Sequence, residues 1–291
     1  MKILLVGCYG QLGWELHRTL MPLGQVYAVD FPQIDMGDAD SIRMHIEKSA
    51  PDVVFNASAY TDVDRAESEP EKAMGINAFG PGILADECLK RRCALIHYST
   101  DYVFDGKKGT CYKENDETNP LGVYGESKLK GEQAIQQIGG SYLILRTSWV
   151  YSLRRSSFVT KLIGWAENKK ELQIVDDQIG NPTWARMLAQ VSSLLAVAGK
   201  ENIYAKFTER AGIYHTAGGG YCSRLDWARE ILRLRGMENF RLTAGKTDDF
   251  PAPAQRPLFS ALNCEAFEQT FGILIPEWKL CLGLAMAENN Q

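Results

Sequence analysis

Three glycines near the N-terminus, Gly7, Gly10 and Gly13, constrain the fold of this chain most strongly. They follow the aliphatic run KILLVG and enter the segment QLGWELHRTL, where leucines recur one helical turn apart. A buried strand, a glycine turn and a helix are expected in that order. Such a turn lets the backbone approach a pyrophosphate, towards which the helix N–H groups point. The pattern predicts a dinucleotide site, with a turn that only packs the helix on the sheet as the alternative.

Asp30 ends the second predicted strand, VYAVD. Its separation from the glycines along the sequence is about that of the acidic residue in dinucleotide-binding motifs. A carboxylate there can accept a hydrogen bond from the 2′-hydroxyl of an adenine ribose and would repel a 2′-phosphate. The next residues are Phe31 and Pro32, so no arginine follows directly to bind such a phosphate. We expect NADH to be used at least as well as NADPH. A helix or turn cap is the other possible role of Asp30.

Aliphatic runs at 52–60 and 94–101 are predicted to be further buried strands, and helical stretches around 38–49 and 71–91 separate them. Alternating strands and helices predict an α/β fold with a doubly wound parallel sheet of the Rossmann type. Ligands of such sheets bind beyond the carboxyl ends of the strands.

After residue 149 this alternation loosens, although 182–199 is expected to form a long amphipathic helix and 212–219 one more sheet strand. These features predict a smaller α/β substrate domain, interleaved in sequence with the first domain, and a substrate cleft between the two. We assign residues 1–149 and 177–217 to the dinucleotide-binding domain and residues 150–176 and 218–291 to the substrate domain.

Composition excludes several other classes of protein. A formal net charge of −4 gives no broad attraction to nucleic acid. No segment approaches the ~18 apolar residues of a membrane span, and the first apolar run is too short for a signal peptide. Seven cysteines without a CxxC motif fit buried thiols in a reducing compartment. We expect a cytoplasmic protein with no nucleic-acid or membrane partner.

Tyr124 and Lys128 stand four residues apart in VYGESKLKGE, the start of a predicted helix. They would share one face, so that the ammonium group could lie near the phenol and lower its pKa. Such a phenol could donate a proton at neutral pH. Thr100, at the end of a predicted central strand, could hydrogen-bond to the same substrate oxygen as hydride arrives. For the isolated pair, an exposed contact between cation and ring is the alternative.

The glycine turn, Asp30, the strand end YSTD and the YxxxK pair, in that order, resemble the extended short-chain dehydrogenase/reductase family. Longer motifs narrow the resemblance to its dTDP-4-dehydrorhamnose reductases, and they are spread over nearly the whole chain: HYSTDYVFDG, NPLGVYGESKLKGE, LRTSWVY, DDQIGNPT and RPLFSALN. The resemblance implies an NAD(P)H-dependent oxidoreductase. Its reaction would reduce the 4-keto group of dTDP-4-dehydro-6-deoxy-L-mannose to give dTDP-L-rhamnose.

The resemblance also assigns roles by position. Tyr124 would donate the proton, Lys128 would lower its pKa and hold the nicotinamide ribose, and Thr100 would orient the ketone. The cofactor would in addition contact residues at the glycine turn and the following strand ends: Gly7, Gly10, Gln11, Leu12, Gly13, Asp30, Asp35, Met36, Ala59, Tyr60 and Thr61. The dTDP-sugar would contact Thr100, Asp101, Tyr102, Trp149 and Arg256.

Some of these residues have plain alternatives. Trp149 could pack on the deoxysugar or fill the core, and Arg256 could bind the diphosphate or form a surface ion pair. The segment SLRRSSF is a departure, because members of the family tend to carry a glycine-containing stretch there. Its Arg154 and Arg155 could bind the diphosphate, indicate another nucleotide sugar, or be solvated.

Two other functions fit the same fold. An epimerase or dehydratase would bind the same cofactor, but the related dehydratases carry an Asp-Glu pair after the strand-end threonine, whereas Tyr102 follows Asp101 here. A non-catalytic dinucleotide-binding regulatory subunit would not need Thr100, Tyr124 and Lys128 together. A homodimer is possible. We expect no metal site, since Glu15, the one candidate ligand, is interpreted as an exposed helix carboxylate.

Overall fold

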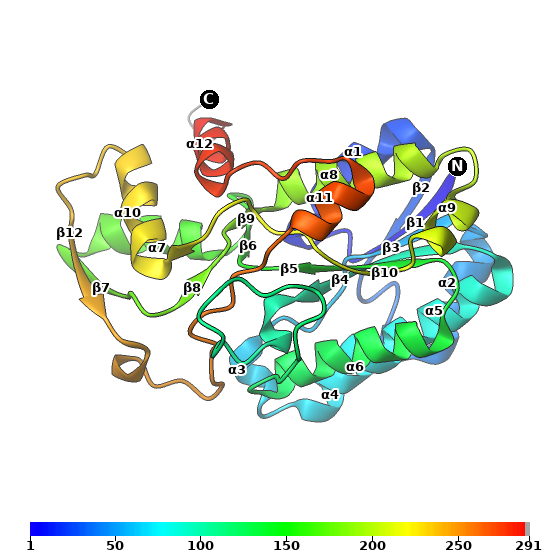
Figure 1. Ribbon diagram of the computed structural model, residues 1–291, viewed down its shortest axis with the longest axis horizontal. Helices are drawn as coiled ribbons and strands as arrows, with labels where there is room; N and C mark the ends of the chain where they lie inside the picture. The colour runs from blue at the N-terminus through cyan, green and yellow to red at the C-terminus, as the bar shows by residue number, and fades with distance from the viewer. Residues whose placement is uncertain (289–291) are drawn as a thin grey trace.

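The computed structural model describes residues 1–288 and confirms the predicted α/β class (Figure 1). Its main sheet has six strands in the order β10-β5-β4-β3-β1-β2, all parallel. The chain passes from β1 to β2 on one side and then to β3 on the other, so the topological switch point lies between β1 and β3. The strands are β1 (Lys2–Val6), β2 (Gln25–Val29), β3 (Val53–Asn56), β4 (Ala94–Thr100), β5 (Tyr142–Thr147) and β10 (Gly212–His215).

Successive residues of β1 enter different cores. Ile3 and Leu5 belong to the cluster that includes Leu16, whereas Leu4 belongs to the cluster that includes Ile42. Because side chains alternate along a strand and helices cover both faces of this sheet, β1 is apolar and buried from Ile3 to Val6.

Helices lie on both faces of the main sheet (Figure 1). One face carries α1 (Gln11–Leu20) and α8 (Ala185–Gly199), and the other carries α2 (Ala39–Ser49), α5 (Gly80–Arg91) and α6 (Val123–Ile138). The shorter helical segments of this part are η1 (Met21–Leu23), α3 (Val63–Ala66), α4 (Pro70–Met74), the π-helical turn η2 (Gly75–Phe79), η3 (Asp101–Val103), α9 (Ile203–Glu209) and α11 (Glu265–Phe271).

A smaller part stands beside the carboxyl ends of the strands, at the left of Figure 1. Its segments flank α8, α9 and β10 in sequence, and the division into two interleaved domains stays a prediction. Two of its strands, β7 and β12, pair in parallel. Its elements are β6 (Val150–Tyr151), α7 (Phe158–Asn168), β7 (Glu171–Val175), β8 (Ile179–Gly180), β9 (Thr183–Trp184), β11 (Cys222–Ser223), α10 (Arg224–Leu234), β12 (Arg241–Gly245), η4 (Thr247–Asp249) and α12 (Trp278–Glu288).

Glu15 corrects one expectation. It is not an exposed carboxylate: it is only 7% exposed, and its Oε2 lies 3.1 Å from Nε of Arg186, on the neighbouring helix α8. Within residues 1–288, no three His, Cys, Asp or Glu side chains are grouped as potential metal ligands. In the same residues no helix is both long and apolar enough to cross a bilayer. The seven cysteines are all free thiols, of which five are buried and two, Cys111 and Cys264, are half-buried.

Candidate functional site

Different structural constraints explain why glycine stands at each of the three positions of the turn. Gly7 has φ +86°, and a Cβ there would lie 2.7 Å from the Ser58 nitrogen. A Cβ on Gly13 would lie 1.9 Å from the Gly7 carbonyl oxygen. Packing alone therefore demands these two glycines. Around Gly10 a Cβ would meet only the Gly7 oxygen, at 3.3 Å, and Gly10 caps α1 without a side-chain hydrogen bond. The open helix N-terminus at Gly10 fits a pyrophosphate.

Asp30 follows β2 and is tied to the glycine turn. Its carboxylate accepts hydrogen bonds from the backbone N–H groups of Tyr9, at 2.7 Å, and Phe31, at 2.8 Å. The capping role considered for Asp30 is therefore present. Each carboxylate oxygen keeps a second lone pair, which leaves acceptor capacity for a ribose hydroxyl.

The side chains of Gln11 and Leu12 are engaged within the protein. Gln11 Oε1 accepts hydrogen bonds from the Ser152 N–H, at 2.7 Å, and the Ser152 hydroxyl, at 3.1 Å. Leu12 lies in the core. These residues can meet a pyrophosphate only through their backbone N–H groups, at the first turn of α1.

Asp35 and Met36 lie in the loop between β2 and α2. The Asp35 carboxylate accepts from the Gly37 N–H, at 2.8 Å. Met36 is buried against Gly80, where a Cβ would come within 2.8 Å of the Met36 methyl carbon. The loop follows β2, which is an edge strand of the sheet, and Met36 is a core residue there.

Asn77 is a residue that the sequence reasoning missed. It binds the backbone of Tyr60 on both sides, accepting from the Tyr60 N–H at 2.8 Å and donating to the Tyr60 carbonyl at 3.0 Å. It also donates to the Ser127 hydroxyl of α6, at 3.0 Å. Asn77 therefore fixes the segment containing Ala59, Tyr60 and Thr61 against the helix that carries Tyr124. It lies in the π-helical turn η2, and sequence periodicity has no signal for such a turn.

The structure brings Thr100, Tyr102 and Tyr124 together at the carboxyl end of β4. Tyr124 lies in the first turn of α6, close enough to Thr100 for the Thr100 hydroxyl to influence the pKa of its phenol. Its ring meets the edge of the Tyr102 ring, with centroids 5.5 Å apart. This close approach depends on Gly125, where a Cβ would lie 2.2 Å from the Tyr102 carbonyl oxygen.

The expected effect of Lys128 on Tyr124 is wrong for this structure. Burial raises the pKa of Tyr124, the neighbouring Thr100 hydroxyl only partly opposes this, and the charge of Asp101 raises the pKa further. Lys128 Nζ instead donates to the Tyr98 carbonyl, at 2.6 Å. Helical spacing placed Tyr124 and Lys128 one turn apart but could not reveal the desolvation of the phenol or the direction of the amine.

His97 is the second contact of the Lys128 amine. It is fully buried, and its Nε2 lies 3.3 Å from Lys128 Nζ. Its Nδ1 lies 3.0 Å from Asn56 Nδ2, and the Asn56 oxygen already accepts from Ser58. Burial and the neighbouring ammonium lower the pKa of His97, so the imidazole is neutral. Burial likewise lowers the pKa of Lys128 to about 8.

Asp101 is buried behind Thr100. Its carboxylate accepts from the Ser260 hydroxyl, at 2.5 Å, and from the Thr100 hydroxyl, at 3.1 Å. Burial raises the pKa of Asp101 in spite of these hydrogen bonds. At 2% exposure Asp101 can support the Thr100 hydroxyl more readily than it can meet a ligand.

Trp149 is half-buried and has φ +45°, an unusual conformation for a tryptophan. Its ring stacks on Trp227, with centroids 5.6 Å apart, and carries the Arg224 guanidinium 3.6 Å above its centre. The sequence reasoning missed Arg224, which follows β11 and begins α10. Arg256, the other cation of this region, forms the ion pair considered for it, with Asp64 at 2.6 Å.

With this geometry established, comparison with known proteins decides the family. A family model described as the RmlD substrate binding domain matches residues 1–290. A dTDP-4-dehydrorhamnose reductase of Burkholderia thailandensis is 39% identical over 296 residues, which cover 99% of each chain. The chain belongs to the RmlD family.

Solved structures of dTDP-4-dehydrorhamnose reductases extend this RmlD assignment to three dimensions. The structure from Clostridium acetobutylicum has a TM-score of 0.92 at 34% identity and covers 100% of both chains. The structure from Bacillus anthracis, in complex with NADP, has a TM-score of 0.89 at 30% identity and covers 99% of this chain and 100% of that one. The predicted resemblance and Rossmann-type fold are confirmed.

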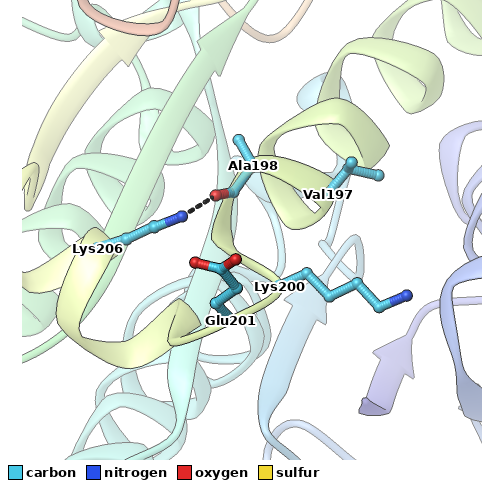
Figure 2. Close-up of a pocket in the computed structure, with 5 residues that line it drawn as sticks. All are labelled: Val197, Ala198, Lys200, Glu201 and Lys206. Atoms are coloured by element: carbon cyan, nitrogen blue, oxygen red, sulfur yellow. Dashed lines mark hydrogen bonds between the residues drawn. The ribbon is translucent and has the colours of Figure 1, made fainter.

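The departure at 152–158 packs on helix α1 through Arg154. Arg154 lies 3.8 Å above the ring of Trp14 in α1, and Arg155 is exposed. A separate surface hollow of about 520 Å³ lies where α8 meets α9, and Figure 2 shows its lining residues. It contains none of the predicted site residues: its lining consists of Val197, Ala198, Lys200, Glu201 and Lys206.

Proposed function

We propose that this protein reduces the 4-keto group of dTDP-4-dehydro-6-deoxy-L-mannose to give dTDP-L-rhamnose, with NADH or NADPH as reductant. The proximity of Thr100 and Tyr124 at the carboxyl end of β4, where Tyr102 contacts both residues, carries the proposal. It lies at the same edge of a parallel sheet as the uncapped α1 N-terminus at Gly10, where a dinucleotide fits. RmlD relatives with the name of this reductase match over nearly the whole chain.

The proton donor is Tyr124. Bound reduced nicotinamide supplies the hydride. The Thr100 hydroxyl and the Tyr124 phenol orient the ketone oxygen, which becomes an alkoxide and takes the phenolic proton. Because burial raises the pKa of Tyr124, the phenol stays protonated at neutral pH and is ready to donate. An alkoxide is a much stronger base than a phenolate, so a lowered pKa is not required for this transfer. Tyr124 then regains a proton from solvent.

The proposed reaction also assigns the other contacts with the cofactor and the sugar. Asp30, beside the glycine turn, binds the adenine ribose, and Lys128 holds the nicotinamide ribose. Tyr102, in edge contact with the Tyr124 ring, faces the sugar. A homodimer and a cytoplasmic location are part of the same proposal.

Turnover of enzymatically prepared dTDP-4-keto-sugar, followed by the loss of nicotinamide absorbance, tests the function. Tyr124→Phe removes the proton donor and should lower kcat by at least about a hundredfold. Tyr142 is the first residue of β5, at the end of the sheet away from the site, so Tyr142→Phe should leave kcat unchanged. No oxidation of NADH or NADPH by the wild type would refute the reductase. Sugar conversion without net oxidation would indicate an epimerase, and an unimpaired Tyr124→Phe would remove the proposed proton donor.

A further inference from the structure

The positively charged side chain of Arg224 lies among three aromatic rings. Its guanidinium carbon lies 3.6 Å above the centre of Trp149, 5.2 Å from that of Phe158 and 5.5 Å from that of Trp227. Burial lowers the pKa of Arg224 to about 10, a range in which the side chain still carries its charge at neutral pH. The rings hold the flat group by its faces, which leaves the N–H donors at its edges free for other partners.

Within residues 1–288, no carboxylate is hydrogen-bonded to the Arg224 guanidinium. Arg256, in contrast, has such a partner. The Arg256 guanidinium donates to Asp64, at 2.6 Å, and to the Ala254 carbonyl, at 2.7 Å. The positive charge of Arg256 is therefore balanced within the protein. A partly buried cation without such a balance is costly unless a ligand supplies the anion.

The surroundings of Arg224 indicate where that anion belongs. The ionisable groups close enough to influence the pKa of Arg224 are Tyr102, Asp101, Cys222 and Arg256. Tyr102 is the residue whose ring contacts Tyr124. Arg224 therefore lies near Tyr102, whose ring contacts the proposed proton donor, and against the ring of Trp149.

We propose that Arg224, held between Trp149, Phe158 and Trp227, binds the diphosphate of the nucleotide-sugar substrate. Planar N–H donors match phosphate oxygens in a bidentate manner, and the stacked rings fix the orientation of the guanidinium before the ligand arrives. Arg256, already paired with Asp64, contributes less. The inference rests on the proposed function only in taking a nucleotide diphosphate as part of the substrate.

Calorimetric titration with dTDP and, separately, with NADPH tests this site. Arg224→Gln should raise the Kd of dTDP at least about tenfold, because a charge-assisted bidentate contact is lost. Arg224→Lys, which keeps the charge, should raise it less. The Kd of NADPH should not change in either variant, which also shows that both are folded. Arg229→Gln, an exposed residue of α10 paired with Asp226, is the matched control and should bind dTDP as the wild type does.

Four results would overturn the inference: a wild type that does not bind dTDP, an unchanged Kd of dTDP in Arg224→Gln, equal losses in Arg224→Lys and Arg224→Gln, or an equal loss of NADPH affinity. Equal losses in the two variants would indicate stacking rather than charge, and a loss of NADPH affinity would assign the cation to the cofactor. Failure of the proposed function has a different signature: dTDP binding would still depend on Arg224, but the wild type would oxidise no cofactor with the keto sugar.

Discussion

Arg146 and Arg224 both lie over aromatic rings, but the described residues give a carboxylate partner only to Arg146. In the main sheet, Arg146 of β5 forms two hydrogen bonds to Glu132 of α6, at 2.9 and 2.7 Å, and lies over Phe104. In the smaller part, Arg224 has three rings and no such partner. The first charge is neutralised inside the fold, and the second is left for a ligand. One side-chain type therefore serves structure or binding according to the groups that the fold places beside it.

Removing the partner of Arg146 should have the largest effect on stability. Glu132→Gln leaves a fully buried guanidinium without its counter-charge, and we expect a loss of about 3 to 5 kcal/mol in the free energy of unfolding, measured with urea. The control is Glu126→Gln, which removes an exposed pair with Lys130 on the same helix and should cost less than about 1 kcal/mol. Similar losses in the two variants would show that the buried pair is not special.

The same comparison predicts that Arg224→Met hardly destabilises the protein, because no charge is orphaned by the change. A loss in urea unfolding as large as that of Glu132→Gln would mean that Arg224 is a structural cation, and the contrast between the two arginines would disappear.

Lys128, one turn before Glu132, should make stability depend on pH. Its pKa in the folded protein is about 8, below the value of about 10.4 for an ordinary lysine. Between these values this amine binds more protons in the unfolded chain than in the folded protein, so its contribution to the free energy of unfolding should rise with pH. The full rise is on the order of 3 kcal/mol, and it should disappear in Lys128→Met. Lys130 is exposed, so Lys130→Met should keep the wild-type dependence of the free energy of unfolding on pH. The same pH dependence in the wild type and both variants would contradict a lowered pKa of the buried Lys128 amine.

A substitution at Asp30 tests the proposed cofactor site. This site is formed by the backbone of the glycine turn and not by an arginine without a carboxylate partner. Asp30→Asn removes the charge that repels a 2′-phosphate, so the ratio of kcat/KM for NADPH to that for NADH should increase about tenfold. The wild type should use NADH at least as well as NADPH. A strong wild-type preference for NADPH, or an unchanged ratio in Asp30→Asn, would exclude Asp30 from this role.

The smallest effect is expected at Arg154, an exposed counterpart of Arg224. It lies over Trp14 in α1, and Arg154→Ala should lower the free energy of unfolding by about 0.5 to 1 kcal/mol. Arg155→Ala, one residue further along, is the control and should be neutral. If Arg154→Ala also weakened dTDP binding as strongly as Arg224→Gln, the two arginines would share one ligand, and the distinction between an exposed and a buried cation would need revision.

Local chemistry was predictable from the sequence because neighbours along the chain determine it. The aliphatic run ending at Gly7 predicted a buried strand and the tight turn after it, and the spacing of Tyr124 and Lys128 predicted a common helix face. The order of motifs indicated the reductase family. These features depend on side-chain periodicity and backbone sterics, which act over a few residues.

Only the tertiary structure decided which groups lose water and which charges find partners. It turned Lys128 towards Tyr98 and His97, buried Glu15, and brought Asn77 to the backbone of Tyr60. It also placed Arg224 on Trp149, which lies 75 residues earlier in the chain. Desolvation and long-range pairing depend on segments that meet only when the sheet and the smaller part assemble, so no local pattern contains them.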